Sequence, residues 1–314
     1  MNNNGWSKIY RSERSNKMIK IANNACSWGV WFIDDPKQPK YDTYLDEFVE
    51  AGYKYSEIGT YGYMPTDPEV LGAELEKRGI VPLAYSIMTP LWDDSSMPAA
   101  MEHVENGCKV LRRLGAPFYV IMDAMYTDLM TDEPVSDPEL TDEQFETFCR
   151  NYRKLAAKVR EYGVKPVFHP HACTHIETEA QIDKFRSMVP KDELRFCLDT
   201  GHHIYIKGND LFAYTEKIAD QIDYLHFKDL SKEVKDYCWE HNIGFAAATK
   251  MNLFAEVGKG VIDWKAYGEL LKKIGYTGYA CIERDCYPPT PGECLKEQKR
   301  TGEYLESIGL GQRK

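Results

Sequence analysis

Several features are missing from this chain of 314 residues, and each absence excludes a class of protein. No apolar run approaches the roughly 18 residues that a membrane-spanning helix needs, so we expect no membrane association. The 39 Lys and Arg are outnumbered by 49 Asp and Glu, and the net charge of -10 argues against a nucleic-acid partner. Residues 1–18 are polar and lack the apolar segment of a secretory signal, which predicts a polar N-terminal arm.

The sequence motifs of several common enzyme classes are also missing. We find no GxSxG nucleophile elbow, no GxxxxGK[ST] phosphate loop and no HExxH metal motif. The nine cysteines are odd in number and form no CxxC pair. Scattered cysteines within apolar patterns are typical of reduced, buried thiols, which predicts a cytoplasmic protein.

Apolar and amphipathic segments alternate regularly after the arm. The expected strands are 19–25, 55–60, 80–88, 117–123, 167–171, 194–200, 222–229 and 279–285. The expected helices are 41–51, 68–77, 97–114, 141–162, 178–188, 211–219, 263–274 and 292–308. Eight strand–helix units without a Gly-rich turn after the first strand favour a (β/α)8 TIM barrel, an α/β fold, as one domain over residues 19–314.

The longest connections follow the fourth expected strand (124–138) and the seventh (230–261). Both run from a strand to a helix, and barrel enzymes bind their substrates on the face where such connections lie. We therefore expect long loops over the active-site face, the second long enough to act as a lid.

Six of the eight histidines lie between residues 167 and 229, close to the ends of expected strands. Asp199, His226 and Glu283 end the sixth, seventh and eighth strands. A single carboxylate at a strand end is more often a helix cap, but two carboxylates and a histidine on three neighbouring strands would be a costly unmatched cluster. The set predicts a site for Mn²⁺, Mg²⁺, Co²⁺ or Zn²⁺. A fourth ligand is expected from the fifth-strand region, which offers the candidates His169, His171 and Glu177.

Further side chains are candidates for contact with a substrate. Lys228 shares the face of His226 and could bind a substrate oxygen, or extend to solvent. Glu57 and Asp123 could bind the hydroxyls of a polyol, or cap helices. Trp28 and Trp31 could stack on a sugar ring, or pack in the core.

The remaining histidines of this stretch are His175, His202 and His203. One of His202 and His203 could contact the substrate or support a ligand, and His202 is the one we favour as a substrate contact. We expect His175 to face solvent.

The chain after Met18 resembles the xylose-isomerase-like barrel superfamily of sugar isomerases, epimerases and dehydratases, and is most similar to its inosose dehydratase branch. Each matching segment is short, but their order along the chain is specific for the superfamily. The segments are SWGV at 27–30, SEIG at 56–59, FHPH at 168–171, IET at 176–178, LDTGH at 198–202, HFKD at 226–229, GKGVID at 258–263 and IER at 282–284.

The resemblance implies one divalent metal, Mn²⁺ before the alternatives, held by Glu, Asp, His and Glu. By position the last three are Asp199, His226 and Glu283, whereas the family's usual fifth-strand glutamate falls where this chain has FHPH. We therefore expect Glu177 as the first ligand and His171 or His169 as an acid or base, with a histidine ligand as the alternative. Arg284, in the IER segment, is a further expected substrate contact.

These residues suit a metal-assisted removal of the proton next to a ketone. The expected substrate is a keto-sugar or cyclitol, such as an inosose or a 3-keto-glycoside, and the outcome is isomerisation, epimerisation or elimination by a lyase. The alternatives are a sugar-binding barrel or partner-dependent subunit without activity of its own, and an endonuclease IV-like phosphodiesterase, which the negative charge disfavours. We also expect a homo-oligomer.

Overall fold

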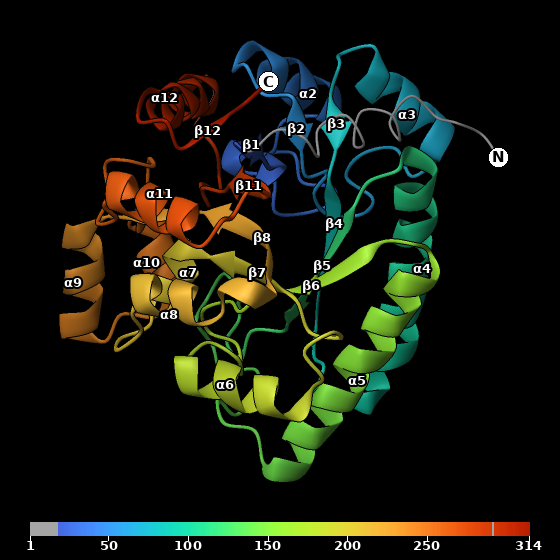
Figure 1. Ribbon diagram of the computed structural model, residues 1–314, viewed down its shortest axis with the longest axis vertical. Coiled ribbons are helices and arrows are strands. Elements are labelled where there is room, and N and C mark those ends of the chain that lie inside the picture. The colour runs from blue at the N-terminus through green and yellow to red at the C-terminus, as the bar shows by residue number, and fades with distance from the viewer. Residues whose placement is uncertain (1–17, 291) are drawn as a thin grey trace.

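Parallel strands lie at the centre of the protein, and helices surround them (Figure 1). The computed structural model describes residues 18–290 and 292–314, so the expected arm lies outside the described residues except for Met18. The strands follow one another around the sheet in the order β3 (Val81–Pro82), β2 (Tyr55–Ser56), β1 (Ile19–Asn23), β11 (Tyr279–Ile282), β8 (Ile222–Phe227), β7 (Phe196–Asp199), β6 (Lys165–Phe168), β5 (Phe118–Asp123) and β4 (Ala84–Thr89).

The two ends of this order belong to one segment of chain, which brings the sheet almost full circle. Strands β3 and β4 flank Leu83, whose N–H donates to the Ser56 carbonyl at 2.8 Å. The Ile58 N–H then donates to the Ala84 carbonyl at 3.0 Å. The predicted TIM barrel is therefore confirmed, with the expected third strand divided in two beside Pro82, which has no N–H to donate.

Each expected helix forms, with ends within two residues of the predicted ones. These helices are α2 (Tyr41–Glu50), α3 (Pro68–Glu76), α4 (Met97–Leu114), α5 (Asp142–Glu161), α6 (Glu179–Met188), α8 (Leu211–Lys217), α11 (Trp264–Lys273) and α12 (Glu293–Ser307). The spacing of Thr141 and Gln144 produces a complete capping box at the start of α5.

Shorter elements fill the connections between these units. They are the 3-10 turns η1 (Ala25–Trp28), η2 (Asp94–Ser96) and η3 (Ala219–Gln221), the helices α7 (Thr200–Tyr205), α9 (Lys232–His241) and α10 (Phe245–Lys250), the antiparallel pair β9 (Asp229–Leu230) and β10 (Phe254–Ala255), and β12 (Gly311–Gln312), which pairs with β1.

The barrel interior is filled by alternate residues of the strands. Cys197, Tyr224 and Cys281 belong to one buried cluster inside the barrel, separate from the larger core under the helices. Because side chains alternate along a strand, the inward position two residues after each of them faces the same interior. On β7, β8 and β11 those positions are Asp199, His226 and Glu283.

The two long connections meet above the carboxyl ends of the strands. Asp132, in the connection after β5, accepts hydrogen bonds from the Ala246 and Ala247 N–H groups at 2.7 and 2.8 Å and so caps α10. This contact holds the loop after β8 over the barrel.

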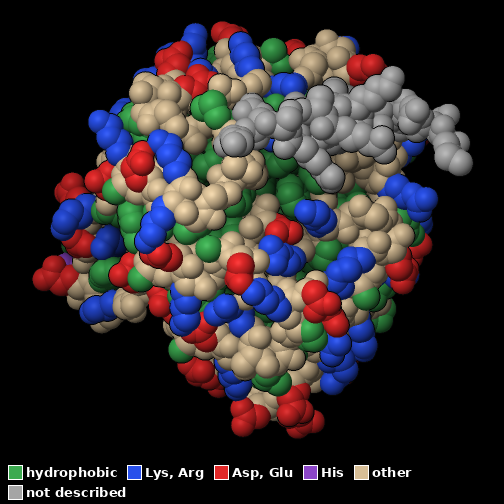
Figure 2. Space-filling view, viewed as in Figure 1, with side chains coloured by type: hydrophobic (Ala, Val, Ile, Leu, Met, Phe, Trp, Pro, Cys, Tyr) green, Lys and Arg blue, Asp and Glu red, His purple; other side chains and the backbone are tan. Residues whose placement is uncertain are grey.

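The surface mixes charges of both signs. On the face shown in Figure 2, Lys and Arg side chains are interspersed with Asp and Glu. Among the described residues, we find no helix with the length and apolar character required to cross a bilayer.

The GKGVID segment owes its conformation to Asp229, a buried residue at the start of β9. Its carboxylate accepts hydrogen bonds from the N–H groups of Gly258, Gly260 and Ile262 at 3.1 to 3.2 Å. It also accepts one from the Trp264 indole at 2.8 Å. A Cβ on Gly260 would lie 2.1 Å from the Asp229 carboxylate, so only glycine allows this approach.

We predict that Asp229→Ala lowers the free energy of unfolding by about 3 kcal/mol, because the buried N–H groups of Ile262 and Trp264 and two partly buried ones lose their acceptor. Chemical denaturation followed by circular dichroism measures this change. The control Asp34→Ala alters an exposed carboxylate and should change stability by less than about 0.5 kcal/mol. Equal effects of the two substitutions would contradict this role of Asp229.

Candidate metal centre and active site

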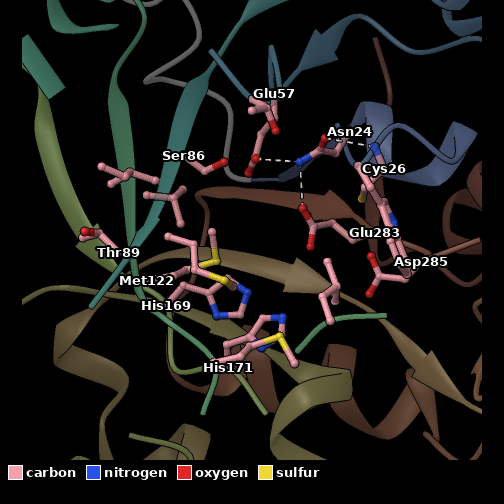
Figure 3. A pocket seen from close by; sticks show the side chains of 18 of the residues that line it. Asn24, Cys26, Glu57, Ser86, Thr89, Met122, His169, His171, Glu283 and Asp285 are labelled. Carbon is pink, nitrogen blue, oxygen red and sulfur yellow. Dashed lines mark hydrogen bonds between the residues drawn. The ribbon is translucent and has the colours of Figure 1, made fainter. Parts of the chain in front are cut away.

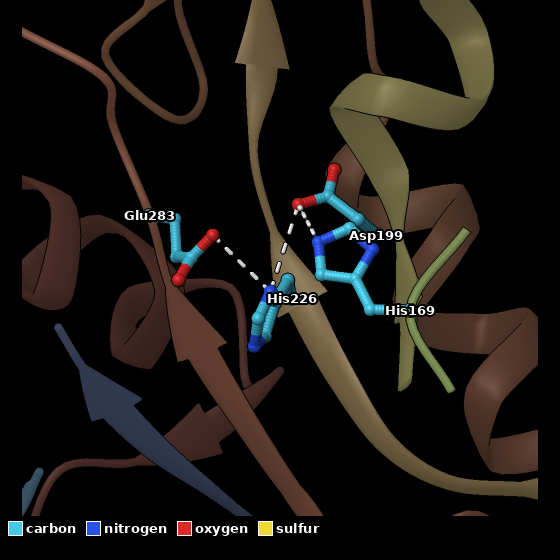
Figure 4. A group of neighbouring side chains, drawn as sticks. All are labelled: His169, Asp199, His226 and Glu283. Atoms are coloured by element: carbon cyan, nitrogen blue, oxygen red, sulfur yellow. Dashed lines mark ion pairs between the residues drawn. The ribbon is translucent and has the colours of Figure 1, made fainter. Parts of the chain in front are cut away.

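Four side chains converge at the carboxyl ends of neighbouring strands (Figure 4). His169 follows β6, Asp199 ends β7, His226 lies on β8, and Glu283 follows β11. All four are buried, and each offers one ligand atom within 4.8 Å of the others.

Each histidine of this group has one ring nitrogen engaged and the other free. Nε2 of His226 lies 2.7 Å from Oε1 of Glu57, and Nδ1 of His169 lies 2.8 Å from the Pro170 carbonyl. Because a carbonyl or carboxylate oxygen only accepts, these nitrogens carry protons, and the opposite nitrogen of each ring is the one that can bind a metal when it is unprotonated. The lone pairs of Nδ1 on His226 and Nε2 on His169 therefore face the centre of the group.

The carboxylates are oriented in the same way. Oδ1 of Asp199 accepts from the His202 N–H at 2.8 Å, and Oε1 of Glu283 accepts from the Asn24 amide at 2.7 Å. Oδ2 of Asp199 and Nδ1 of His226 are buried without a hydrogen-bond partner. Buried polar atoms without partners are costly, which points to a group that these residues are built to bind.

The free atoms suit a divalent cation. Nδ1 of His226 lies 3.1 Å from Oε2 of Glu283 and 3.8 Å from Oδ2 of Asp199, and Nε2 of His169 lies 3.7 Å from the same Asp199 oxygen. Atoms that share one ion are separated by such distances, since each ligand bond is about 2.0–2.2 Å long. Two imidazole nitrogens and two carboxylate oxygens could hold a borderline divalent metal such as Mn²⁺ or Zn²⁺.

Glu177 lies outside this group, which differs from our expectation. Its Oε2 accepts from the Cys173 N–H at 2.6 Å, and its Oε1 accepts from the Tyr126 hydroxyl at 3.1 Å. These bonds direct the carboxylate to the loop that follows β6. His169, a histidine that the sequence had left open as the alternative to Glu177, is the fourth member of the group.

Lys228 lies beside the metal group and is 2 % exposed, so its side chain does not extend to solvent. Its Nζ lies 2.9 Å from Nε2 of His202. His202 in turn packs against His171, with 3.6 Å between the ring centres. The Lys228 ammonium is surrounded by carboxylates at 2.9, 3.3 and 3.6 Å, those of Asp285, Glu283 and Asp199.

The charges of these two neighbours are set by their surroundings. Burial opposes the charge of Lys228, but the three carboxylates outweigh it and raise the pKa of the ammonium well above its usual value. Burial, followed by the nearby Lys228 charge, lowers the pKa of His171 to about 3. Nδ1 of His171 donates to the Ala172 carbonyl at 2.7 Å. The neutral ring therefore keeps the lone pair of Nε2 available.

These groups line one end of a cavity of about 670 Å³ (Figure 3). His169, His171, His226, Lys228 and Glu283 all border it. Glu57 borders it as well and orients His226, so a predicted polyol contact lies at the site. Phe245 and Thr249 of α10 cover the same cavity.

Two expected substrate contacts are placed elsewhere. Trp28 is 2 % exposed, packs edge-on against Tyr44 and donates to Glu47, so it is part of the core, while Trp31 borders the cavity. Arg284 pairs with Glu297 at 2.8 Å and turns away from the cavity. The partners of Trp28 and Arg284 come from segments distant in the sequence. The residue types and the strand pattern therefore could not predict them.

Asp123 and His175 form a buried pair, which corrects two expectations at once. Nδ1 of His175 lies 2.6 Å from Oδ2 of Asp123, and its Nε2 lies 3.0 Å from the Asp137 carbonyl. Oδ1 of Asp123 accepts from the Leu91 N–H at 3.1 Å. Asp123 thus connects the loops that contain Leu91 and His175 and does not face a substrate. His175 is 2 % exposed, so it does not face solvent as expected.

Two residues at the site, Asn24 and Asp285, were not among the candidates expected from the sequence. Asn24 donates to both Glu57 and Glu283, at 2.8 and 2.7 Å, and Asp285 pairs with Lys228. Asn24 lies near the carboxyl end of the expected strand 19–25, and Asp285 ends the expected strand 279–285. Because barrel active sites form at the carboxyl ends of strands, these positions could have marked both residues as candidates.

Comparison with known proteins agrees with this architecture. Residues 45–308 match the family described as xylose isomerase-like TIM barrel, and the chain belongs to this family. An inosose dehydratase of Lacticaseibacillus casei is 28% identical over 287 residues, which cover 88% of this chain and 94% of that protein. One of Serratia proteamaculans (strain 568) is 29% identical over 266 residues, 82% of this chain and 88% of that protein.

Solved structures share the fold at lower identity. The IolI protein with a binding zinc atom superposes with a TM-score of 0.70 at 17% identity, over 92% of this chain and 98% of that one. The structure of an L-ribulose 3-epimerase superposes with a TM-score of 0.67 at 17% identity, over 93% of this chain and 95% of that one.

We predict that the protein binds about one divalent ion per chain and that His169→Ala weakens this binding more than about 100-fold, because a ligand is lost. Calorimetric titration with Zn²⁺ and with Mn²⁺ measures the affinity, and elemental analysis the stoichiometry. Glu177→Ala is the matched comparison and should retain the ion. Loss of the ion in Glu177→Ala with retention in His169→Ala would reverse the assignment.

The His175–Asp123 pair predicts a pH-dependent contribution to stability. Burial alone would lower the pKa of His175, but the hydrogen bond and charge of Asp123 raise it above 6.5. The stabilisation is therefore complete below the usual pKa and is lost as the pH rises through the raised value. The melting-temperature difference between the wild type and His175→Gln should shrink over that range. The exposed His241→Gln should show no such trend.

Proposed function

We propose that the chain is a divalent-metal-dependent enzyme that removes the proton from the carbon next to the ketone of a keto-sugar or cyclitol. The observation that carries this proposal is the convergence of His169, Asp199, His226 and Glu283, with their free atoms aimed at one point beside a cavity. The relatives named inosose dehydratase support an enzyme of the sugar isomerase, epimerase or dehydratase type.

A divalent ion held by these four residues would supply Lewis-acid polarisation of the ketone, and we expect Mn²⁺ before Zn²⁺, Co²⁺ or Mg²⁺. Oε1 of Glu57 accepts a hydrogen bond from Nε2 of His226, and the Asn24 amide donates one to Glu283. Their role is to orient the ligands before a substrate arrives, which limits reorganisation during the reaction.

His171 is the proposed base. Its ring is neutral, and Nε2 can accept the proton from the substrate carbon. The electron pair of the broken C–H bond then moves into a C=C bond, and the ketone oxygen takes up the negative charge. The packing of His202 against the His171 ring keeps that ring in position.

Lys228 is the proposed acid. Its ammonium is buried beside Asp199 and Glu283, where it can donate a hydrogen bond to a substrate oxygen. In an elimination, the C=O bond of the ketone forms again and the C=C bond shifts to lie between the deprotonated carbon and the next carbon. The C–O bond on that next carbon breaks, and the Lys228 proton completes the departing water or alcohol. Reprotonation at carbon instead gives isomerisation or epimerisation. The names of the relatives favour elimination.

The remaining expectations also stay proposals. The net charge of -10 disfavours the phosphodiesterase alternative. A cytoplasmic location and a homo-oligomeric assembly are further predictions.

We predict that the metal-loaded protein exchanges the proton next to the ketone of an inosose for deuterium in D₂O, as followed by NMR. His171→Gln should slow the exchange about 10²–10⁴-fold, the usual contribution of a general base, and should retain the ion. His241→Gln, an exposed histidine, should leave the rate unchanged. Full exchange by His171→Gln would exclude His171 as the base, and no exchange by the metal-loaded wild type with any keto-cyclitol or keto-sugar would favour a binding protein.

A further inference from the structure

The cavity beside the metal group is larger than a single sugar ring requires. A monocyclic keto-polyol has roughly a dozen non-hydrogen atoms; at the volume of a whole water for each, about 30 Å³, it would fill about 360 Å³. This generous allowance still leaves close to half of the roughly 670 Å³ unfilled. The total lies in the range of sites that bind drug-sized ligands.

The charged groups that line the cavity gather at one end. They are Glu57, Lys228, Glu283 and Asp285, all in contact with one another or with the metal ligands. In Figure 3, Glu283 and Asp285 lie on the side of the cavity opposite Thr89 and Met122. A polar ring bound at the metal group would therefore leave the other side to a different part of the ligand.

That other side, which we name the apolar compartment, is built by β4, β5 and the loop that follows β5. Its apolar lining residues include Met88, Val120, Met122, Met125 and Leu129. Ala99 and Ala100 of α4 border the same cavity, and their small side chains leave space. None of these side chains offers a charge or a strong hydrogen bond.

The polar groups on this side carry no net charge. Ser86 and Thr89 present hydroxyl groups. His103 has its pKa lowered by burial, and its Nδ1 is engaged with the Tyr119 hydroxyl at 2.9 Å. Apolar walls with a few neutral polar groups are typical of a site for an organic ring system.

We propose that the substrate of this site is a keto-sugar or keto-cyclitol that carries an apolar, aromatic-sized substituent, and that the apolar compartment binds this substituent. This inference rests on the proposed function, since it assigns the polar ring to the metal end. Three methionines line the compartment, and their flexible thioethers adapt to aromatic groups of different shape. The site thus accepts a class of glycosides with apolar aglycones, not a bare polyol alone.

The test compares two stable probes, phenyl β-D-glucoside and methyl β-D-glucoside, by calorimetric titration of the metal-loaded full chain. The phenyl compound should bind at least about tenfold more tightly, because its ring is withdrawn from water. Equal affinities, or the absence of binding by both compounds, would overturn the proposal.

Two substitutions locate the preference. Met122→Gln on β5 and Met88→Gln on β4 keep the side-chain length but place an amide in the compartment, and each should reduce the phenyl preference at least threefold. Met188→Gln, on the distant surface of α6, is the matched control and should retain the preference. Thermal melting shows that each variant is folded. A preference that persists in both compartment variants would place the phenyl ring elsewhere.

The assay of proton exchange separates this inference from the proposed function. Exchange with an inosose but no phenyl preference would refute the apolar compartment and leave the function intact. Phenyl preference without exchange on any keto substrate would support the compartment and refute the function.

Discussion

The alternation of side chains along the barrel strands is the constraint on which the site depends. Tyr224 fills the barrel interior, and the next inward residue of β8 is His226, followed by Lys228 two residues later. The same step leads from Cys197 to Asp199 and, on the eighth unit, from Cys281 to Glu283. The residues that close the core below the site therefore also determine the direction of the polar groups above it.

Burial then turns a set of polar residues into an oriented site. Each candidate ligand has one polar atom held by a neighbour and another left free, as with His226 between Glu57 and the centre of the group. A buried polar atom without a hydrogen-bond partner costs free energy. The neighbours fix the orientation of each ligand, and a bound cation would provide the partner that the free atoms lack. The ammonium of Lys228 offsets part of the negative charge beside it.

Three further carboxylates hold the loops that surround this site. Asp229 gathers the N–H groups of the GKGVID segment, Asp123 pairs with His175, and Asp132 caps α10. Each lies outside the metal group and accepts hydrogen bonds that would otherwise be unmatched in a folded loop. Phe245, at the start of α10, is positioned beside the cavity by the last of these contacts.

The sequence by itself determined the barrel, the order of its units and three of the four converging residues. These features follow from local periodicity, since apolar strands with a polar carboxyl end have one arrangement in a parallel barrel. It also indicated that the fourth comes from the region of the fifth strand, but the residue expected there was Glu177, with a histidine of the FHPH segment as the alternative. His169, His171 and Glu177 are all chemically able to bind a metal, and only the path of the chain after β6 separates them.

Tertiary structure alone decided the matters that depend on contacts between distant segments. Glu177 accepts a hydrogen bond from Tyr126, and Trp28 packs against Tyr44 of α2. Asp123 pairs with His175, which we had expected to face solvent. The cavity beside the metal group likewise needs β4, β5 and α10 together. A periodic pattern reports which way a side chain points from its own strand, whereas the partner that it meets depends on packing across the whole barrel.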